Sequence, residues 1–136
     1  MFSIFFFSCE KESLINSVPQ IEFISISPDI AQEYSDEITI SIKYTDEDGD
    51  LGENSPDINN LFMKDNRNTI EYEYRIPQLT PNENEISITG IFNIIIDGTG
   101  ITNGSASEKV SYEVYVVDRS NNKSNSIITS EITIQQ

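Results

Sequence analysis

The sequence predicts an all-β fold, and three observations favour it. Apolar and polar residues alternate in several segments, stretches rich in Gly, Pro and Asn separate these segments, and no segment carries apolar residues at a convincing helical spacing. Alternation places every second side chain on the same face of a strand, so each segment has one buried and one solvated face. A chain of 136 residues with 37% apolar residues is sufficient for one such domain.

Seven segments fit the strand pattern. In the clearest one, Ile38, Ile40 and Ile42 alternate with polar residues. We expect strands at 21–27, 37–45, 60–65, 69–76, 86–96, 109–117 and 126–134, with Gly90 as a β-bulge. Seven short antiparallel strands separated by turns predict a single immunoglobulin-like β-sandwich over residues 20–136.

The alternation also assigns the tyrosines. Tyr72, Tyr74 and Tyr112 fall on the same parity as the apolar residues of their segments, which predicts core positions. Tyr115 has the opposite parity from Val114 and Val116, so it is the best candidate for an exposed aromatic.

Residues 1–19 do not follow the strand pattern. An apolar run, Met1–Phe7, ends at Ser8-Cys9 and is followed by the charged residues 10–12. The run is shorter than the roughly 20 residues that span a bilayer, and it is typical of the end of a secretory signal peptide. The alternative is a buried first strand in which Cys9 is an ordinary thiol.

The Ser8-Cys9 junction resembles a bacterial lipobox. This resemblance implies that residues 1–8 are a signal peptide remnant, that Cys9 is lipidated, and that residues 9–19 are a linker. The charged cluster after Cys9 resembles the surface-export signals of lipoproteins in the Bacteroidetes group. We therefore expect a lipid anchor in the bacterial outer membrane or at the cell surface, with the periplasmic face as the alternative.

Composition excludes several functions. Eight Lys and Arg residues against 23 Asp and Glu residues give a formal net charge of −15, which disfavours binding to nucleic acid. The chain has no His and a single Cys, so it has no Ser-His-Asp triad, no Cys-His pair, no imidazole zinc site and no internal disulfide. Only carboxylate chemistry or a Ser-Lys pair is left for catalysis, without a recognisable motif, and we expect no enzyme.

Acidic residues are concentrated in the stretch 44–57, YTDEDGDLGENSPD. In a sandwich of antiparallel strands, the loops after the second and sixth strands lie at the same end, so Asp118 comes close to Asp46, Asp48 and Asp50. Ca²⁺ takes six to eight oxygen ligands, and alternate residues of an irregular loop can direct several oxygens at one point. An EF-hand is excluded, because its sixth and twelfth positions would be Leu51 and Asp57.

The motifs YTDEDGDLG and YVVDRSNNKSN resemble the acidic loops of immunoglobulin-like or cadherin-like domains in Bacteroidetes lipoproteins. The resemblance implies a calcium site with Asp46, Asp48, Asp50 and Asp118 as ligands and with a contribution from Asn121. The alternative is a solvated turn, because Asp48-Gly49 is itself a strong turn signal.

These observations predict a lipid-anchored, non-enzymatic envelope or surface protein. It would act as a binding or spacer module, stabilised by calcium, with a protein or a glycan as its partner. The alternative function is that of a carbohydrate-capture accessory lipoprotein, in which exposed aromatic residues contact a glycan.

Overall fold

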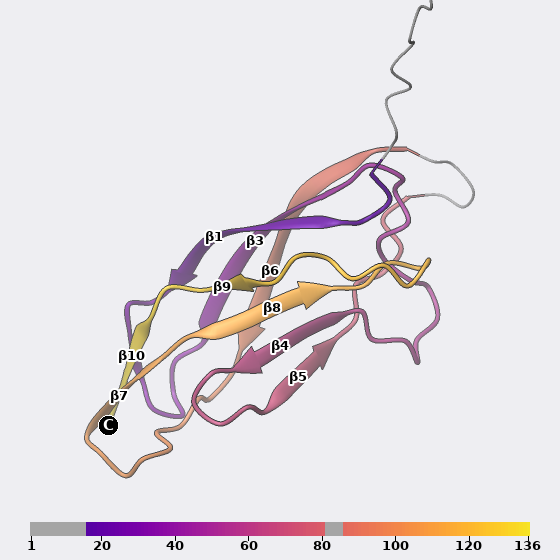
Figure 1. Cartoon of the computed structure of the whole chain (residues 1–136). Helices are drawn as coiled ribbons and strands as arrows, with labels where there is room; N and C mark the ends of the chain where they lie inside the picture. Colours follow the sequence, from indigo (N-terminus) through magenta and orange to yellow (C-terminus); the bar gives the residue numbers. More distant parts are fainter. Residues whose placement is uncertain (1–15, 81–85) are drawn as a thin grey trace, which may run out of the picture.

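The computed structural model describes residues 16–80 and 86–136, and these residues form ten strands and no helix (Figure 1). The expected all-β class is therefore confirmed. The strands form three sheets rather than the seven-stranded arrangement expected from the alternation pattern. The expected signal peptide, residues 1–8, and the expected lipidation site, Cys9, lie outside the described residues.

The first sheet has the order β1–β3–β6 and is antiparallel throughout. Its central strand β3 (Ile38–Asp46) pairs with β1 (Gln20–Ser27) and, along its full length, with β6 (Ile88–Ile96). The register between β3 and β6 runs from Ile38 opposite Ile96 to Asp46 opposite Ile88. Asp46 is thus the last residue of a central strand.

The second sheet has the order β5–β4–β8–β9, formed by β5 (Glu71–Tyr74), β4 (Leu61–Asp65), β8 (Tyr112–Val116) and β9 (Ile127–Ile128). It lies on the opposite side of the molecule from the first sheet (Figure 1). A small third sheet, β2–β10–β7, consists of β2 (Ile30–Gln32), β10 (Ile132–Gln135) and β7 (Ser107–Val110).

One hydrophobic cluster joins the three sheets. The buried side chains alternate along β3, β4 and β8, as the period of two requires. The cluster consists of Ile21, Ile26, Ala31, Ile38, Ile40, Ile42, Leu51, Leu61, Met63, Ile76, Ile94, Ile96, Val110, Tyr112, Val114, Val116, Ile132 and Ile134.

Two expected strands are divided in the structure. The expected strand 109–117 is interrupted at Ser111, so that β7 pairs with β10 while β8 pairs with β4. The expected strand 126–134 is likewise divided into β9 and β10. Each division lets one continuous segment take part in two sheets. Strand β2 was not expected, because three residues are too few for an alternating pattern.

The bulge expected at Gly90 is wrong. Gly90 pairs regularly with Tyr44, and the irregularity lies instead in β1, between Phe23 and Ser25. A Cβ atom at position 90 would collide with the phenol ring of Tyr44, which also stacks on Phe92 at 4.2 Å between ring centroids. Glycine is therefore needed here to make room for an aromatic ring.

The tyrosine assignments are correct in part. Tyr112 is buried as expected, and Tyr115 lies on the outer face of β8. Tyr74, expected in the core, is half-buried and packs against it, whereas Tyr72, also expected in the core, is exposed on the edge strand β5.

Candidate metal centre

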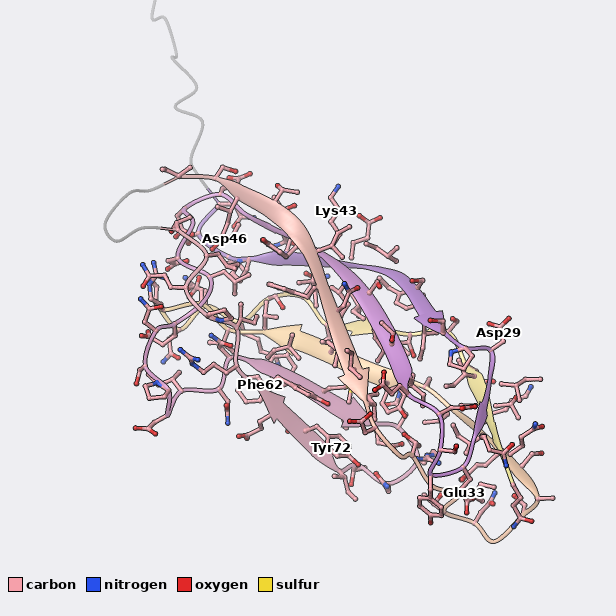
Figure 2. The ribbon with its side chains drawn as sticks, turned by 180° about the vertical axis from the view of Figure 1, so that it is seen from behind. Asp29, Glu33, Lys43, Asp46, Phe62 and Tyr72 are labelled. Carbon is pink, nitrogen blue, oxygen red and sulfur yellow. The ribbon has the colours of Figure 1, made fainter. Side chains whose placement is uncertain are left out.

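Two loops meet at one end of the molecule. The first follows β3 and spans residues 47–60, and the second follows β8 and spans residues 117–126. Figure 2 shows Asp46 at this end and Glu33 at the other. Strands β3 and β8 belong to different sheets but both end here, which brings the two motifs of the sequence together.

Four aspartates converge where the loops meet. Asp46, Asp48, Asp50 and Asp118 each offer one carboxylate oxygen, and these four oxygens lie within 4.8 Å of one another. Asp46 is fully buried and Asp118 is 6% exposed. The four carboxylates that we identified as candidate ligands are therefore neighbours in space, and the cluster could hold a metal ion.

Local backbone geometry directs the first loop toward this point. Gly49 has φ +69°, and a Cβ atom there would collide with the carbonyl oxygen of Ile86. The side chain of Leu51 is buried in the core, and its N–H donates to Asp46 Oδ2 at 2.7 Å. The turn at Gly49 and the anchor at Leu51 place Asp48 and Asp50 on either side of the turn, close to Asp46.

Direct hydrogen bonds join the two loops. The N–H of Arg119 donates to the carbonyl oxygen of Asp50 at 3.1 Å, and the hydroxyl of Ser120 donates to Asp50 Oδ2 at 2.6 Å. The guanidinium of Arg119 donates to the carbonyl oxygen of Gly52 at 2.7 Å. The second loop is thus attached to the backbone of the first loop as well as to a carboxylate of the cluster.

A tight turn positions Asp118. Its carboxylate accepts from Asn122 twice: from the backbone N–H at 2.7 Å and from Nδ2 at 3.0 Å. Asn121 has φ +69° in this turn, and its N–H donates to the carbonyl oxygen of Asp118 at 3.1 Å. Asn121, expected to contribute an oxygen ligand, is exposed and lines a cavity of about 290 Å³ beside the cluster.

Asn122 is a residue that sequence reasoning missed. It fixes the orientation of Asp118 through both of its nitrogen donors. An Asp followed four positions later by Asn in a loop would have been the signal, because short amide and carboxylate side chains commonly bond to nearby backbone in turns.

The cluster is electrostatically costly without a cation. The Oδ1 atoms of Asp46, Asp48 and Asp50 are buried and accept no hydrogen bond within the described part of the chain. Burial, together with the close approach and the charge of Asp48, raises the pKa of Asp46 to about 8. Burial also raises the pKa of Asp48 and of Asp118.

Asp50 behaves differently from its neighbours. Burial acts to raise its pKa, but the hydrogen bond from Ser120 and the close contacts with the neighbouring Asp48 and Asp118 outweigh this and lower it. Asp50 therefore carries the negative charge, while Asp46 holds a proton near neutral pH. A cation would replace that proton and would supply the missing partner of the buried oxygens.

The donor set consists of carboxylate oxygens, which hard cations prefer over nitrogen or sulfur ligands. The buried Oδ1 atoms supply an observation independent of the clustering itself, since a buried unpartnered carboxylate oxygen is rare in folded proteins. The residues present thus fit a hard divalent cation.

The chain enters the fold beside this cluster. The N–H of Asn16 donates to Glu47 Oε2 at 2.6 Å, and Asn122 Nδ2 donates to the carbonyl oxygen of Ser17 at 3.3 Å. The first loop therefore contacts Asn16 and the second loop contacts Ser17, shortly before β1 begins at Gln20. These are the first described residues of the expected linker.

An aromatic pair lies on the outer face of the second sheet. Phe62 and Tyr115 stack with 5.0 Å between ring centroids, and Lys123 Nζ lies 4.0 Å from the centroid of Tyr115. The hydroxyl of Tyr115 donates to Glu71 at 3.0 Å. Phe62 also lines the 290 Å³ cavity beside Asp118, together with Arg119 and Asn121.

Comparison with family models, curated proteins and solved structures found no match. Between residues 16 and 136, leaving aside 81–85, no helix is long and apolar enough to cross a membrane. Fold and site together define the class: an all-β protein with a four-aspartate cluster built from two loops at one end.

Proposed function

We propose that the chain is a lipid-anchored, non-enzymatic binding or spacer module of a bacterial envelope, with an immunoglobulin-like or cadherin-like β-sandwich stabilised by Ca²⁺. The observation that carries the calcium part is the convergence of Asp46, Asp48, Asp50 and Asp118 around buried, unpartnered oxygens. Ca²⁺ suits this site better than Mg²⁺, because it tolerates irregular geometry and several carboxylates, whereas Mg²⁺ requires a near-ideal octahedron and keeps its waters.

Calcium would stabilise the fold by joining its two loops. Four carboxylates held close together in a poorly solvated place repel one another, and this repulsion opposes folding. A bound cation removes the repulsion, and because the unfolded chain does not hold the loops together, binding adds to the free energy of unfolding.

The test is thermal unfolding of the full chain with and without calcium. Ca²⁺ at about 100 times its dissociation constant stabilises by roughly 2.7 kcal/mol, which corresponds to a rise in Tm on the order of 10 °C for a domain of this size. The double variant Asp48→Asn with Asp50→Asn should lose this rise. The matched control is Asp29→Asn with Asp57→Asn, two exposed acids outside the cluster, which should keep it. A wild-type Tm unchanged at millimolar Ca²⁺ would remove calcium from the proposal.

The lipid anchor is a separate part of the proposal and rests on the Ser8-Cys9 junction. Its test is metabolic labelling with palmitate in a bacterial host that processes lipoproteins. Label that is present in the wild-type chain and lost in Cys9→Ala supports the anchor. A wild-type protein that is secreted freely into the medium contradicts it.

The absence of catalysis is proposed from the lack of His and the use of the clustered acids as ligands. The spacer role is supported by the place of the cluster, whose loops contact Asn16 and Ser17, the first described residues of the expected linker. A rigid attachment there would fix the direction in which the sandwich extends from the membrane.

A second candidate function is glycan capture by an accessory lipoprotein. The observation that favours it is the 290 Å³ cavity, where the ring of Phe62 lies beside the polar side chains of Arg119 and Asn121. Aromatic faces bind the apolar faces of sugars, and neighbouring polar groups bind their hydroxyls. A glycan array probed with the calcium-loaded protein tests this function: binding lost in Phe62→Ala supports it, and an array without hits contradicts it.

A further inference from the structure

Strand β6 forms an open edge of the first sheet. The sheet order β1–β3–β6 leaves one side of β6 without a strand partner among the described residues, and Figure 2 shows β6 as the outermost strand of that sheet. An open edge presents a row of backbone N–H and C=O groups that can pair with another strand.

The other long edge of this sheet is protected. At the β1 edge, the side chain of Asn125 accepts from the N–H of Ile21 at 2.9 Å and donates to the carbonyl oxygen of Ile21 at 2.8 Å. Strand β1 also carries Glu22 and an irregular register after Phe23. Charges and bulges at an edge prevent pairing with other chains.

The β5 edge of the second sheet is protected by charge. Strand β5 carries the exposed acids Glu71 and Glu73 along four residues. A second strand approaching this edge would meet like charges if it came from an acidic chain, and the short length of β5 further limits pairing.

Strand β6 has no such protection. The segment from Ile86 to Ile96 contains no charged residue and no proline, and β6 is nine residues long. On its outward face, Ile91 is 61% exposed and Ile95 is 52% exposed. A cavity of about 470 Å³, lined mainly by apolar side chains including Tyr74, Leu79 and Phe92, runs along the same edge.

We propose that the β6 edge is a dimer interface, at which β6 pairs antiparallel with β6 of a second copy of this chain about a two-fold axis. The axis passes beside Asn93, so that Asn93 lies opposite Asn93 of the second copy. Each Ile91 then faces Ile95 of the other copy, and the two sheets become one continuous six-stranded sheet. A two-fold contact of this kind uses the same patch on both copies and closes at two subunits.

The register follows from the side chains. In an antiparallel pair of identical strands, the residue numbers of two opposite residues always add up to the same value. Alternate residues of a strand point to opposite faces, so outward-facing residues lie opposite outward-facing residues only when this value is even. The register centred on Asn93 pairs the two exposed isoleucines with each other. On the inner face it pairs Phe92 with Ile94 of the second copy, so apolar side chains meet on both faces.

The charge distribution favours a second copy at this edge. The chain carries a net charge of −15, so two copies repel one another over most of their surfaces. The paired segment, Gly90 to Ile96, is neutral, and the pairing buries no carboxylate. The neighbour of Ile91 on β3 is Lys43, a cation, which further lowers the local negative potential.

The first test is sedimentation velocity of the full chain over a concentration series, with salt to screen the net charge. A monomer–dimer equilibrium is expected, and Ile91→Lys with Ile95→Lys should weaken it at least tenfold by placing four like charges at the interface. Ile128→Lys is the matched control, because Ile128 is 62% exposed on β9, away from the β6 edge. Circular dichroism confirms that each variant is folded.

The second test reports on the register. Residues directly opposite one another in an antiparallel pair have Cα atoms about 4.5–5.5 Å apart, which permits a disulfide. In the full chain carrying Cys9→Ser, Asn93→Cys should form a disulfide-linked dimer under mild oxidation. Ile128→Cys, at an exposed position on β9 away from the β6 edge, should form it at least tenfold more slowly.

Three results would overturn the proposal. The first is a monomer at every concentration up to millimolar. The second is a dimer that the two lysine substitutions leave unchanged, since the interface would then lie elsewhere. The third is open-ended assembly, because a two-fold contact closes at the dimer.

Discussion

The hydroxyl of Ser120 donates to Asp50 Oδ2 at 2.6 Å, joining two residues that are 70 positions apart in the chain. This bond links the loop after β3 to the loop after β8 and contributes to the low pKa of Asp50. It orients one carboxylate of the cluster toward the other three. The cluster is therefore a tertiary feature, formed only when both sheets have assembled.

The metal-free protein should lose stability as the pH rises. The pKa of Asp46 is raised to about 8, first by burial and then by Asp48, whereas an unfolded aspartate has a pKa near 3.9. Between pH 4 and pH 8 the folded chain therefore holds a proton that the unfolded chain has released, and the free energy of unfolding falls across this range. The lowered pKa of Asp50 acts in the opposite direction, but at more acidic pH.

Thermal unfolding in EDTA from pH 5 to pH 8.5 measures this dependence. We expect Tm to fall with increasing pH and the fall to be much smaller in Asp46→Asn, which has no proton to lose at this position. In saturating Ca²⁺ the stabilisation by the ion should grow with pH, because metal binding displaces the proton. A slope in EDTA that is the same in wild type and in Asp46→Asn would contradict the assignment.

Arg67 should be essential for stability at the opposite end of the molecule. Its guanidinium lies 2.8 Å from the buried carboxylate of Asp65 and 3.1 Å from that of Glu108, and it also donates to the carbonyl oxygen of Gly100 at 2.7 Å. Arg67→Ala leaves the buried carboxylate of Asp65 without its cation, although the backbone N–H of residue 67 still donates to it at 2.9 Å. Removing one member of a buried ion pair costs about 3–5 kcal/mol.

Urea unfolding monitored by circular dichroism measures the effect of Arg67→Ala. Lys109→Ala is the control, because Lys109 and Glu131 form an exposed pair at 3.9 Å, and such pairs contribute at most about 1 kcal/mol. If both variants lost the same free energy of unfolding, the ion pairs of Arg67 would not stabilise the fold more than an exposed pair does.

Asn60 should contribute to stability, because its side chain forms hydrogen bonds with the backbone of Ile76 as a neighbouring strand would. Its Oδ1 accepts from the N–H of Ile76 at 2.6 Å and its Nδ2 donates to the carbonyl oxygen of Ile76 at 3.0 Å, in a buried place. Asn60→Ala removes both bonds and leaves the N–H of Ile76 without its partner, while the carbonyl oxygen of Ile76 keeps the bond from the N–H of Glu53 at 3.0 Å. The loss of one hydrogen bond and the burial of an unpaired N–H together cost about 2–4 kcal/mol. Asn59→Ala, at the exposed neighbouring position, should change the free energy of unfolding by less than about 0.5 kcal/mol in the same urea experiment.

The fold class and the proximity of the two loops could both be predicted from the sequence. Alternation along residues such as Ile38, Ile40 and Ile42 shows directly which face is buried, and the direction of successive strands then places Asp118 near Asp50. Both inferences need only local periodicity and a count of strands up to the loop concerned.

Other features could not be derived from the pattern. The break at Ser111 keeps the apolar alternation intact on both sides, so periodicity does not detect that the segment changes sheets. The fit of Tyr44 over Gly90 and the bonds from Asn122 to Asp118 depend on the distance between side chains in space. Alternation describes faces of strands and carries no information on such contacts.

Isothermal titration of the metal-free full chain with CaCl₂ tests the calcium site most directly. We expect one Ca²⁺ per chain, with no comparable binding of Mg²⁺ at the same concentration, and loss of the calcium heat in Asp46→Asn, where a neutral amide replaces the fully buried carboxylate. A chain that takes up no Ca²⁺ at millimolar concentration, or that binds it equally well after Asp46→Asn, would contradict a calcium site formed by the two loops.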